Sequence, residues 1–79
     1  MDEMMEFERW IKIVLKKLNS ATIEDTTAIL ILAVIQEVKI NRRKANLEKL
    51  LNNLEMLGFS NLIPSQQQIQ KWIELGEIK

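Results

Sequence analysis

The chain has 79 residues, 47% of them hydrophobic and 28% charged, and its eleven Lys and Arg balance its eleven Asp and Glu. This composition is typical of one folded domain and excludes a disordered chain, and the zero net charge gives no general attraction to nucleic acid or to an anionic membrane. Cysteine and histidine are absent, which excludes disulfides and thiolate metal sites. The acidic start MDEMMEFERW does not resemble a signal peptide, so we expect a cytoplasmic protein.

The first segment predicts an amphipathic helix over about residues 3–18. At 100° per residue its apolar side chains fall within an arc of about 140°. These side chains are Met4, Phe7, Trp10, Ile11, Val14, Leu15 and Leu18. Ile13 lies outside this stripe and is left as surplus apolar surface.

The second segment contains eight consecutive apolar residues, Ala28 to Ile35. A short apolar run also fits a buried strand. Two features favour a helix over residues 23–40: the sequence TIED, in which Thr22 is followed by Asp25 as in a capping box, and QEVK continuing without Gly or Pro. A membrane span needs about 20 apolar residues, and charged residues flank this run of eight on both sides, so we do not expect it to cross a membrane.

On a helix, the apolar residues of this run point in nearly every direction. Such a helix needs cover on all sides, either from the rest of the chain or from a second copy. We therefore expect the second helix to be central in the fold.

The third segment has leucines at helical spacing and predicts a helix over about 42–57. The second and third helices either break near Asn41 or run on through RRK, and we favour the break because a continuous helix of about 35 residues is unusual in a small domain. Gly58 is placed to end this helix in a left-handed conformation, with Phe59 folding back onto Leu54.

The fourth segment begins with SQQQ, a capping box with Ser65 as N-cap and Gln68 three residues later. It predicts a short helix over 66–75 that ends at Gly76. Residues 1–79 are therefore expected to form a single all-α domain, a small four-helix, bundle-like fold.

No residue pattern typical of an active site is present. Without His or Cys, the base for a nucleophile would have to be a carboxylate or a lysine, and none is suggestively placed. Trp10 and Trp72 continue apolar stripes, which predicts that they belong to the core. We expect no enzymatic activity, no cofactor, no metal and no small-molecule substrate.

The surplus apolar surface instead predicts protein binding, because large exposed apolar patches mark interaction sites. The expected module is a homodimer through the second helix, or a binder of another protein. The expected contact residues are Ile13, Ile29, Ile31, Leu32 and Ile35.

A small DNA-binding regulator is the alternative, with a divergent helix-turn-helix in residues 47–77. Its expected contacts are a basic cluster, Arg42, Arg43 and Lys44, together with Gln67 and Lys71. It ranks second, because the spacer NLIPS exceeds the usual three- or four-residue turn and this end of the chain is net negative.

Overall fold

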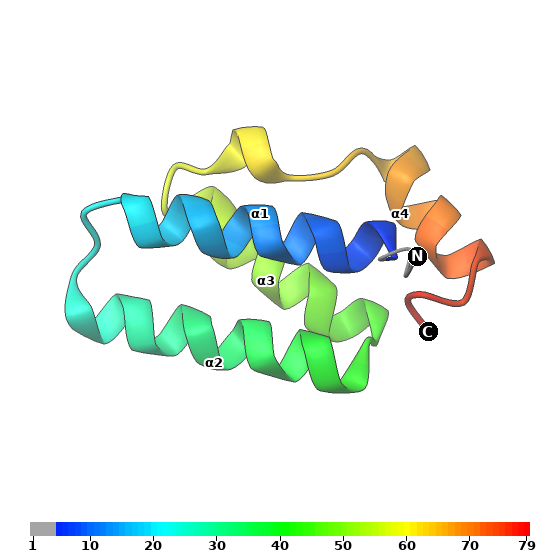
Figure 1. Ribbon diagram of the computed structural model, residues 1–79, viewed down its shortest axis with the longest axis horizontal. Coiled ribbons are helices and arrows are strands. Elements are labelled where there is room, and N and C mark those ends of the chain that lie inside the picture. The colour runs from blue at the N-terminus through cyan, green and yellow to red at the C-terminus, as the bar shows by residue number, and fades with distance from the viewer. Residues whose placement is uncertain (1–4) are drawn as a thin grey trace, which may run out of the picture.

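The computed structural model describes residues 5–79, in which all regular secondary structure is helical. The elements are α1 (Glu6–Ser20), α2 (Asp25–Asn41), α3 (Lys44–Met56), the 3-10 turn η1 (Ser60–Leu62) and α4 (Gln66–Glu74), as Figure 1 shows. The predicted all-α class with four helices is confirmed. The predicted first turn from residue 3, with Met4, lies outside the described residues.

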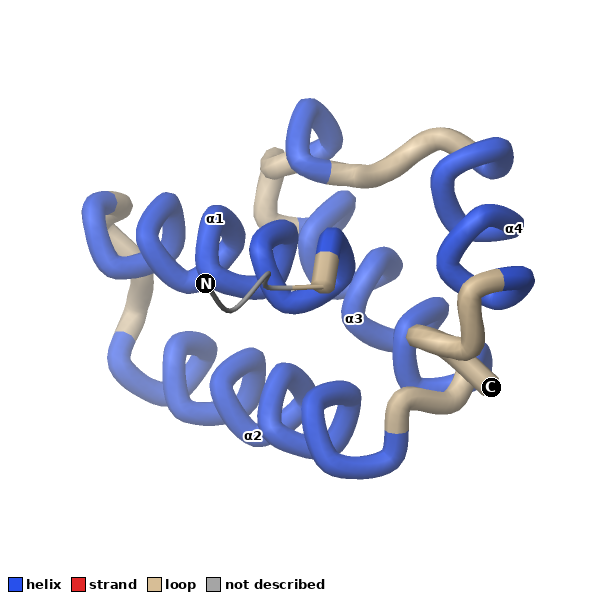
Figure 2. The backbone as a smooth tube through the Cα atoms, turned by 45° about the vertical axis from the view of Figure 1, so that its right-hand side comes forward, coloured by secondary structure: helices blue, strands red, loops and turns tan. Residues whose placement is uncertain are grey.

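The helices are not all parallel. In Figure 1, α1 and α2 run side by side in opposite directions, α3 lies behind α1, and α4 stands across the end where α1 begins. Figure 2 shows the same relation from another side, with α4 closing one end of the molecule. The fold is therefore a layer of α1 and α2 on α3, with α4 as an end piece.

One core joins the four helices, and each contributes a stripe at helical spacing. Its largest members are aromatic: the ring centroids of Phe7 and Trp72 are 5.4 Å apart, and those of Trp10 and Trp72 are 5.5 Å apart. Both tryptophans are buried, so their predicted place in the core is confirmed. The Trp10 Nε1 also donates to the Leu62 carbonyl at 2.7 Å, which fixes η1 on α1.

The second helix differs from the prediction that it is central. α2 buries only one stripe, formed by Ile31, Val34, Ile35 and Val38. The opposite side faces solvent, because α1 and α3 lie on the other side of α2 and no described element covers its outer side. The helix whose apolar side chains point in nearly every direction thus lies at the edge of the fold, with one side in solvent.

The predicted helix ends are confirmed in part. Arg42 has a left-handed conformation (φ 51°) and ends α2, which confirms the break. Gly58 and Gly76 have φ of 86° and 78°, and the Phe59 amide donates to the Leu54 carbonyl at 2.9 Å. The Gln68 amide donates to Ser65 Oγ at 3.1 Å.

Two capping predictions are wrong in detail. Thr22 caps nothing, because Ile23 packs against the core and α2 begins only at Asp25, after Glu24. The Gln68 side chain does not return to Ser65 as a full capping box requires; its Nε2 donates to Glu6 Oε2 at 3.1 Å instead.

Candidate interaction site

The outward side of α2 carries large apolar side chains in solvent. Ile29, Leu30, Leu32 and Ile40 are 67%, 63%, 45% and 77% exposed. Ile29, Ala33, Gln36 and Ile40 are spaced by four, three and four residues, which places them within about 60° of one another around the helix. We call these four residues the outer strip; Leu30 and Leu32 flank it.

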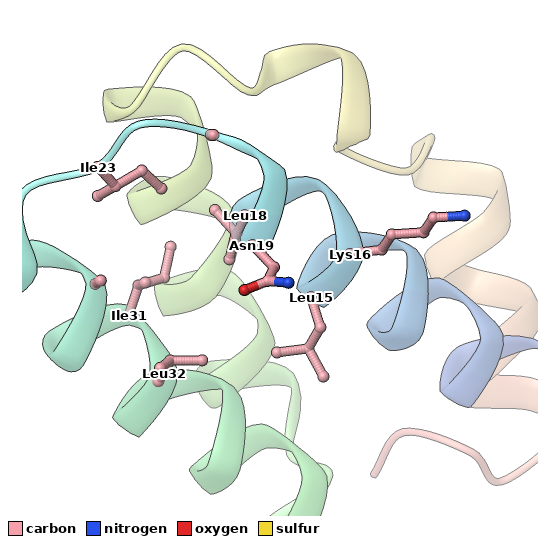
Figure 3. Close-up of a pocket in the computed structure, with 9 residues that line it drawn as sticks. Leu15, Lys16, Leu18, Asn19, Ile23, Ile31 and Leu32 are labelled. Carbon is pink, nitrogen blue, oxygen red and sulfur yellow. The ribbon is translucent and has the colours of Figure 1, made fainter.

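A groove separates α1 from α2 on the side that α3 does not cover. It consists of two open hollows that share Leu15, one of about 540 Å³ where α1 ends and α2 begins, and one of about 340 Å³ near the start of α1. Figure 3 shows the larger one, with Leu15 and Leu18 facing Ile31 and Leu32 across it. We call this the α1–α2 groove.

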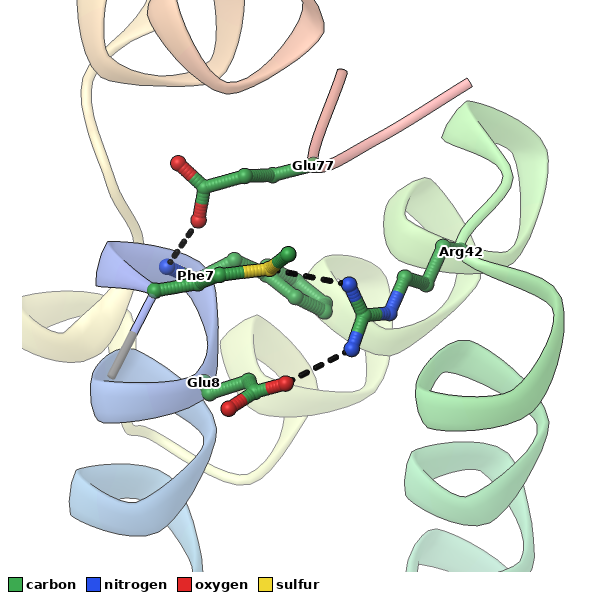
Figure 4. Close-up of polar contacts among 5 residues, drawn as sticks. Phe7, Glu8, Arg42 and Glu77 are labelled. Atoms are coloured by element: carbon green, nitrogen blue, oxygen red, sulfur yellow. Dashed lines mark hydrogen bonds and ion pairs between the residues drawn. The ribbon is translucent and has the colours of Figure 1, made fainter. Parts of the chain in front are cut away.

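The rim of the groove is mostly basic. Its charged lining residues are Lys12, Lys16, Lys39, Arg42 and Glu8. Arg42 Nη2 lies 2.7 Å from Glu8 Oε1, and Arg42 Nη1 donates to Met5 Sδ at 3.0 Å (Figure 4). Pairing with Arg42 occupies the single carboxylate of the lining, so the three lysines define the charge that a ligand would meet.

Hydrogen bonds made by the C-terminal residues hold the chain together where α1 begins and α2 ends. The Glu77 side chain is only 5% exposed, and its Oε1 accepts a hydrogen bond from the Phe7 amide at 2.9 Å (Figure 4). This carboxylate caps α1, whose own N-cap residue, Met5, makes no side-chain cap. The Lys79 amide donates to the Arg42 carbonyl at 2.7 Å, and the Lys44 amide to the Lys79 carbonyl at 3.1 Å.

Sequence reasoning did not identify Glu77. The predicted helix begins at residue 3 and places Met5 inside it, so nothing in the sequence marks Met5 as an N-cap without a capping side chain. Which of the chain's acidic residues would supply the cap is decided by the fold alone.

The structure separates the predicted dimer contacts into three places. Ile29 and Leu32 are exposed on α2, whereas Ile31 and Ile35 are core residues, 3% and 0% exposed. Ile13 is 50% exposed but lies about 160° around α1 from Leu15, which faces the groove. Leu30 and Ile40 were not predicted; the spacing of Ile40 eleven residues after Ile29 was the signal for one shared face.

The predicted nucleic-acid contacts are divided between the junction of α2 with α3 and the helix α4, and two of them are paired with carboxylates. Arg42 is held by Glu8, while Arg43 and Lys44 are exposed where α2 meets α3. On α4, Gln67 is exposed and Lys71 Nζ lies 3.8 Å from Glu6 Oε1.

The connection between α3 and α4 also differs from a tight helix-turn-helix. It spans the nine residues 57–65, which include η1, against the usual three or four.

Within residues 5–79, no helix is long and apolar enough to cross a membrane. Comparison of the chain with protein-family models, with curated proteins and with solved structures gives no match.

Proposed function

We propose that this chain is a non-enzymatic protein–protein interaction module that forms a homodimer through the outer strip of α2. One observation carries the proposal: four large apolar side chains of a single helix, 45% to 77% exposed, lie on its outward side, where Ala33 and Gln36 separate Ile40 from the other three. Isolated apolar residues are ordinary on protein surfaces, but several large apolar side chains exposed on one side of a helix mark an interaction site.

The outer strip is suited to pairing with itself in antiparallel orientation. Its spacing of four, three and four residues is that of a coiled-coil seam. With the two-fold axis between Ala33 and Gln36, Ile29 of one copy meets Ile40 of the other, and Ala33 meets Gln36. The small Ala33 side chain leaves room at the axis for the longer Gln36 side chain of the other copy.

The charges at the two ends of α2 favour the same orientation. Its start carries the exposed carboxylates of Glu24 and Asp25, and its end carries exposed Lys39 and Arg43. Antiparallel pairing brings the acidic start of one copy to the basic end of the other, whereas parallel pairing would bring like charges together. A two-fold homodimer needs such a self-complementary surface.

The size of the strip predicts a weak dimer. The 17 residues of α2 extend over about 25 Å, but the strip is only one helix face wide. Stable interfaces of ordinary size bury roughly 800 Å² on each partner, which is more than such a strip provides. We therefore expect dissociation in the micromolar range.

Sedimentation velocity across the micromolar to millimolar range tests the proposal. We expect a concentration-dependent shift from monomer to dimer, which Ile40→Glu abolishes and Ile29→Glu weakens. Both place a charge in an apolar contact, at a cost on the order of 3 kcal/mol for an unpaired charge. In the antiparallel pair the carboxylate of Ile40→Glu lies beside the acidic start of the other copy, whereas that of Ile29→Glu lies near its basic end. Both residues are exposed in the monomer, so the variants should fold.

The matched control is Ile13→Glu, an equally exposed isoleucine on the far side of α1. It should leave the dimer intact. A wild-type chain that stays monomeric throughout the range, or an Ile13→Glu variant that dissociates as readily as Ile29→Glu, would contradict the proposal.

A further inference from the structure

The α1–α2 groove is a second apolar surface, separate from the outer strip. Its floor is formed by side chains of both helices, among them Leu15, Leu18 and Ile31. Ile31 and Leu18 are 3% and 8% exposed, so the floor is part of the core and keeps its shape without a ligand.

The groove has the length and the position of a missing helix. Its lining runs along α1 from Phe7 to Asn19, which is about 18 Å, the length of a helix of about twelve residues. In a four-helix bundle the pair α1 and α2 would be covered on both sides, but here α3 lies on one side and α4 crosses the end (Figures 1 and 2).

The basic rim selects the charge of the occupant. Lys12, Lys16 and Lys39 are exposed along the groove, and the carboxylate of Glu8 is already paired with Arg42. We propose that the α1–α2 groove binds an acidic amphipathic helix of another protein, with the apolar face of that helix on the floor and its carboxylates beside these lysines. This function is additional to the homodimer.

A helix fits the groove better than a single alkyl chain does. Both hollows are partly open to solvent, so an alkyl chain lying on the floor would keep part of its surface in water. A helix that lies along such a groove buries one face and keeps the other in solvent, as amphipathic helices do in other grooves.

The test uses two synthetic helical peptides of about twelve residues, matched to the groove length. Both carry the same leucine stripe; one has glutamates at the remaining positions and the other has lysines. In methyl NMR spectra we expect the acidic peptide to shift the signals of Leu15, Leu18 and Ile31. Its affinity at low salt should exceed that of the basic peptide about tenfold, and the preference should shrink as salt is added.

Reversing the rim charge should reverse the preference. The double variant Lys12→Glu, Lys16→Glu should favour the basic peptide. The matched control, Lys17→Glu with Lys49→Glu, makes the same change of net charge at exposed lysines that do not line the groove, and should retain the acidic preference.

The homodimer and the groove can fail separately. Ile29→Gln with Ile40→Gln weakens the outer strip without changing charge, and the acidic peptide should still bind to this variant. Three results would overturn the proposal. The first is equal affinity for the two peptides, and the second is a set of shifts that maps to Ile29 and Ile40 instead of the floor. The third is that dodecanoate, an alkyl chain, binds more tightly than the acidic peptide and displaces it from the groove.

Discussion

The two ends of the α1–α2 pair are built differently. Where α1 begins and α2 ends, the Glu77 carboxylate, the Arg42 guanidinium and the backbone of Lys79 tie the helices to the rest of the chain. Where α1 ends and α2 begins, the short connection 21–24 and the core side chains of Leu18 and Ile31 join them, and the larger hollow, about 540 Å³, lies between them. We call these the closed end and the open end.

The difference is one of stability. The closed end holds the aromatic cluster and the buried polar contacts, so its side chains are already engaged within the chain. Ile29, Leu30 and Leu32 are exposed on α2 nearer the open end, whereas Ile40, 77% exposed, lies at the closed end, so the exposed apolar side chains extend along the whole of α2. A small domain can expose this much apolar surface only if its remaining contacts keep it folded.

The largest expected effect comes from removing the aromatic side chain at the closed end. Trp72 is 2% exposed, so Trp72→Ala should lower the free energy of unfolding by about 3–5 kcal/mol. Its Nε1 has no hydrogen-bond partner among the described residues, so the loss is one of packing. Urea unfolding followed by far-ultraviolet circular dichroism measures it.

Leu32→Ala is the counterpart at the open end. Because Leu32 is 45% exposed, this change should cost less than about 1 kcal/mol. If Trp72→Ala is unfolded in buffer, the milder variant Trp72→Phe, which keeps an aromatic ring, can be measured in its place. Similar losses for Leu32→Ala and Trp72→Phe would show that the two ends contribute equally, and would break the comparison.

A smaller effect is expected from the carboxylate that caps α1. Glu77→Ala should cost about 1–3 kcal/mol, because it leaves the Phe7 amide without its partner inside the fold. Glu77→Gln retains an acceptor and should cost less, about 0.3–1 kcal/mol for the lost charge at the helix terminus. Hydrogen exchange of the Phe7 amide, together with urea unfolding, measures both.

Glu74→Ala is the matched control for this prediction. Glu74 is exposed in α4, so its removal should change stability by no more than about 0.5 kcal/mol. If Glu74→Ala and Glu77→Ala were equally destabilising, the carboxylate of Glu77 would have no special role at the closed end.

The smallest expected effect is on nucleic acid. Arg42 is bound to Glu8 at the closed end, so we expect no measurable binding to duplex DNA near physiological salt, and at low salt only weak binding without sequence preference. Fluorescence anisotropy with labelled duplexes at several salt concentrations measures this. A sequence-selective complex that is lost in Arg42→Ala, Arg43→Ala or in Gln67→Ala, Lys71→Ala would restore the DNA-binding alternative.

Local signals in the sequence were sufficient for the elements of the fold. Ser65, Gly58 and Gly76 act on residues within one turn of themselves, and their predicted roles are observed. The contacts of the closed end were not predictable in this way. Glu77 and Phe7 are 70 residues apart and Arg42 and Glu8 are 34 apart, and no local pattern connects them.

The candidate surface could be predicted only in part, for a different reason. Ile29 and Ile31 are the same residue type, two positions apart in one apolar run, yet one is 67% and the other 3% exposed. When a helix is apolar on every side, its periodicity does not tell which side faces the core. The positions of α1 and α3 decide this, and they depend on the whole chain.

The bond between Phe7 and Glu77 also bears on the order in which the molecule assembles. Closing a loop of 70 residues costs on the order of 4 kcal/mol in chain entropy, whereas α2 and α3 are joined directly through Arg42 and Arg43. We therefore expect the hairpin of α2 and α3 to form early and the docking of residues 77–79 to come last. Until residues 77–79 dock, the first turn of α1 lacks the carboxylate that caps it in the folded chain.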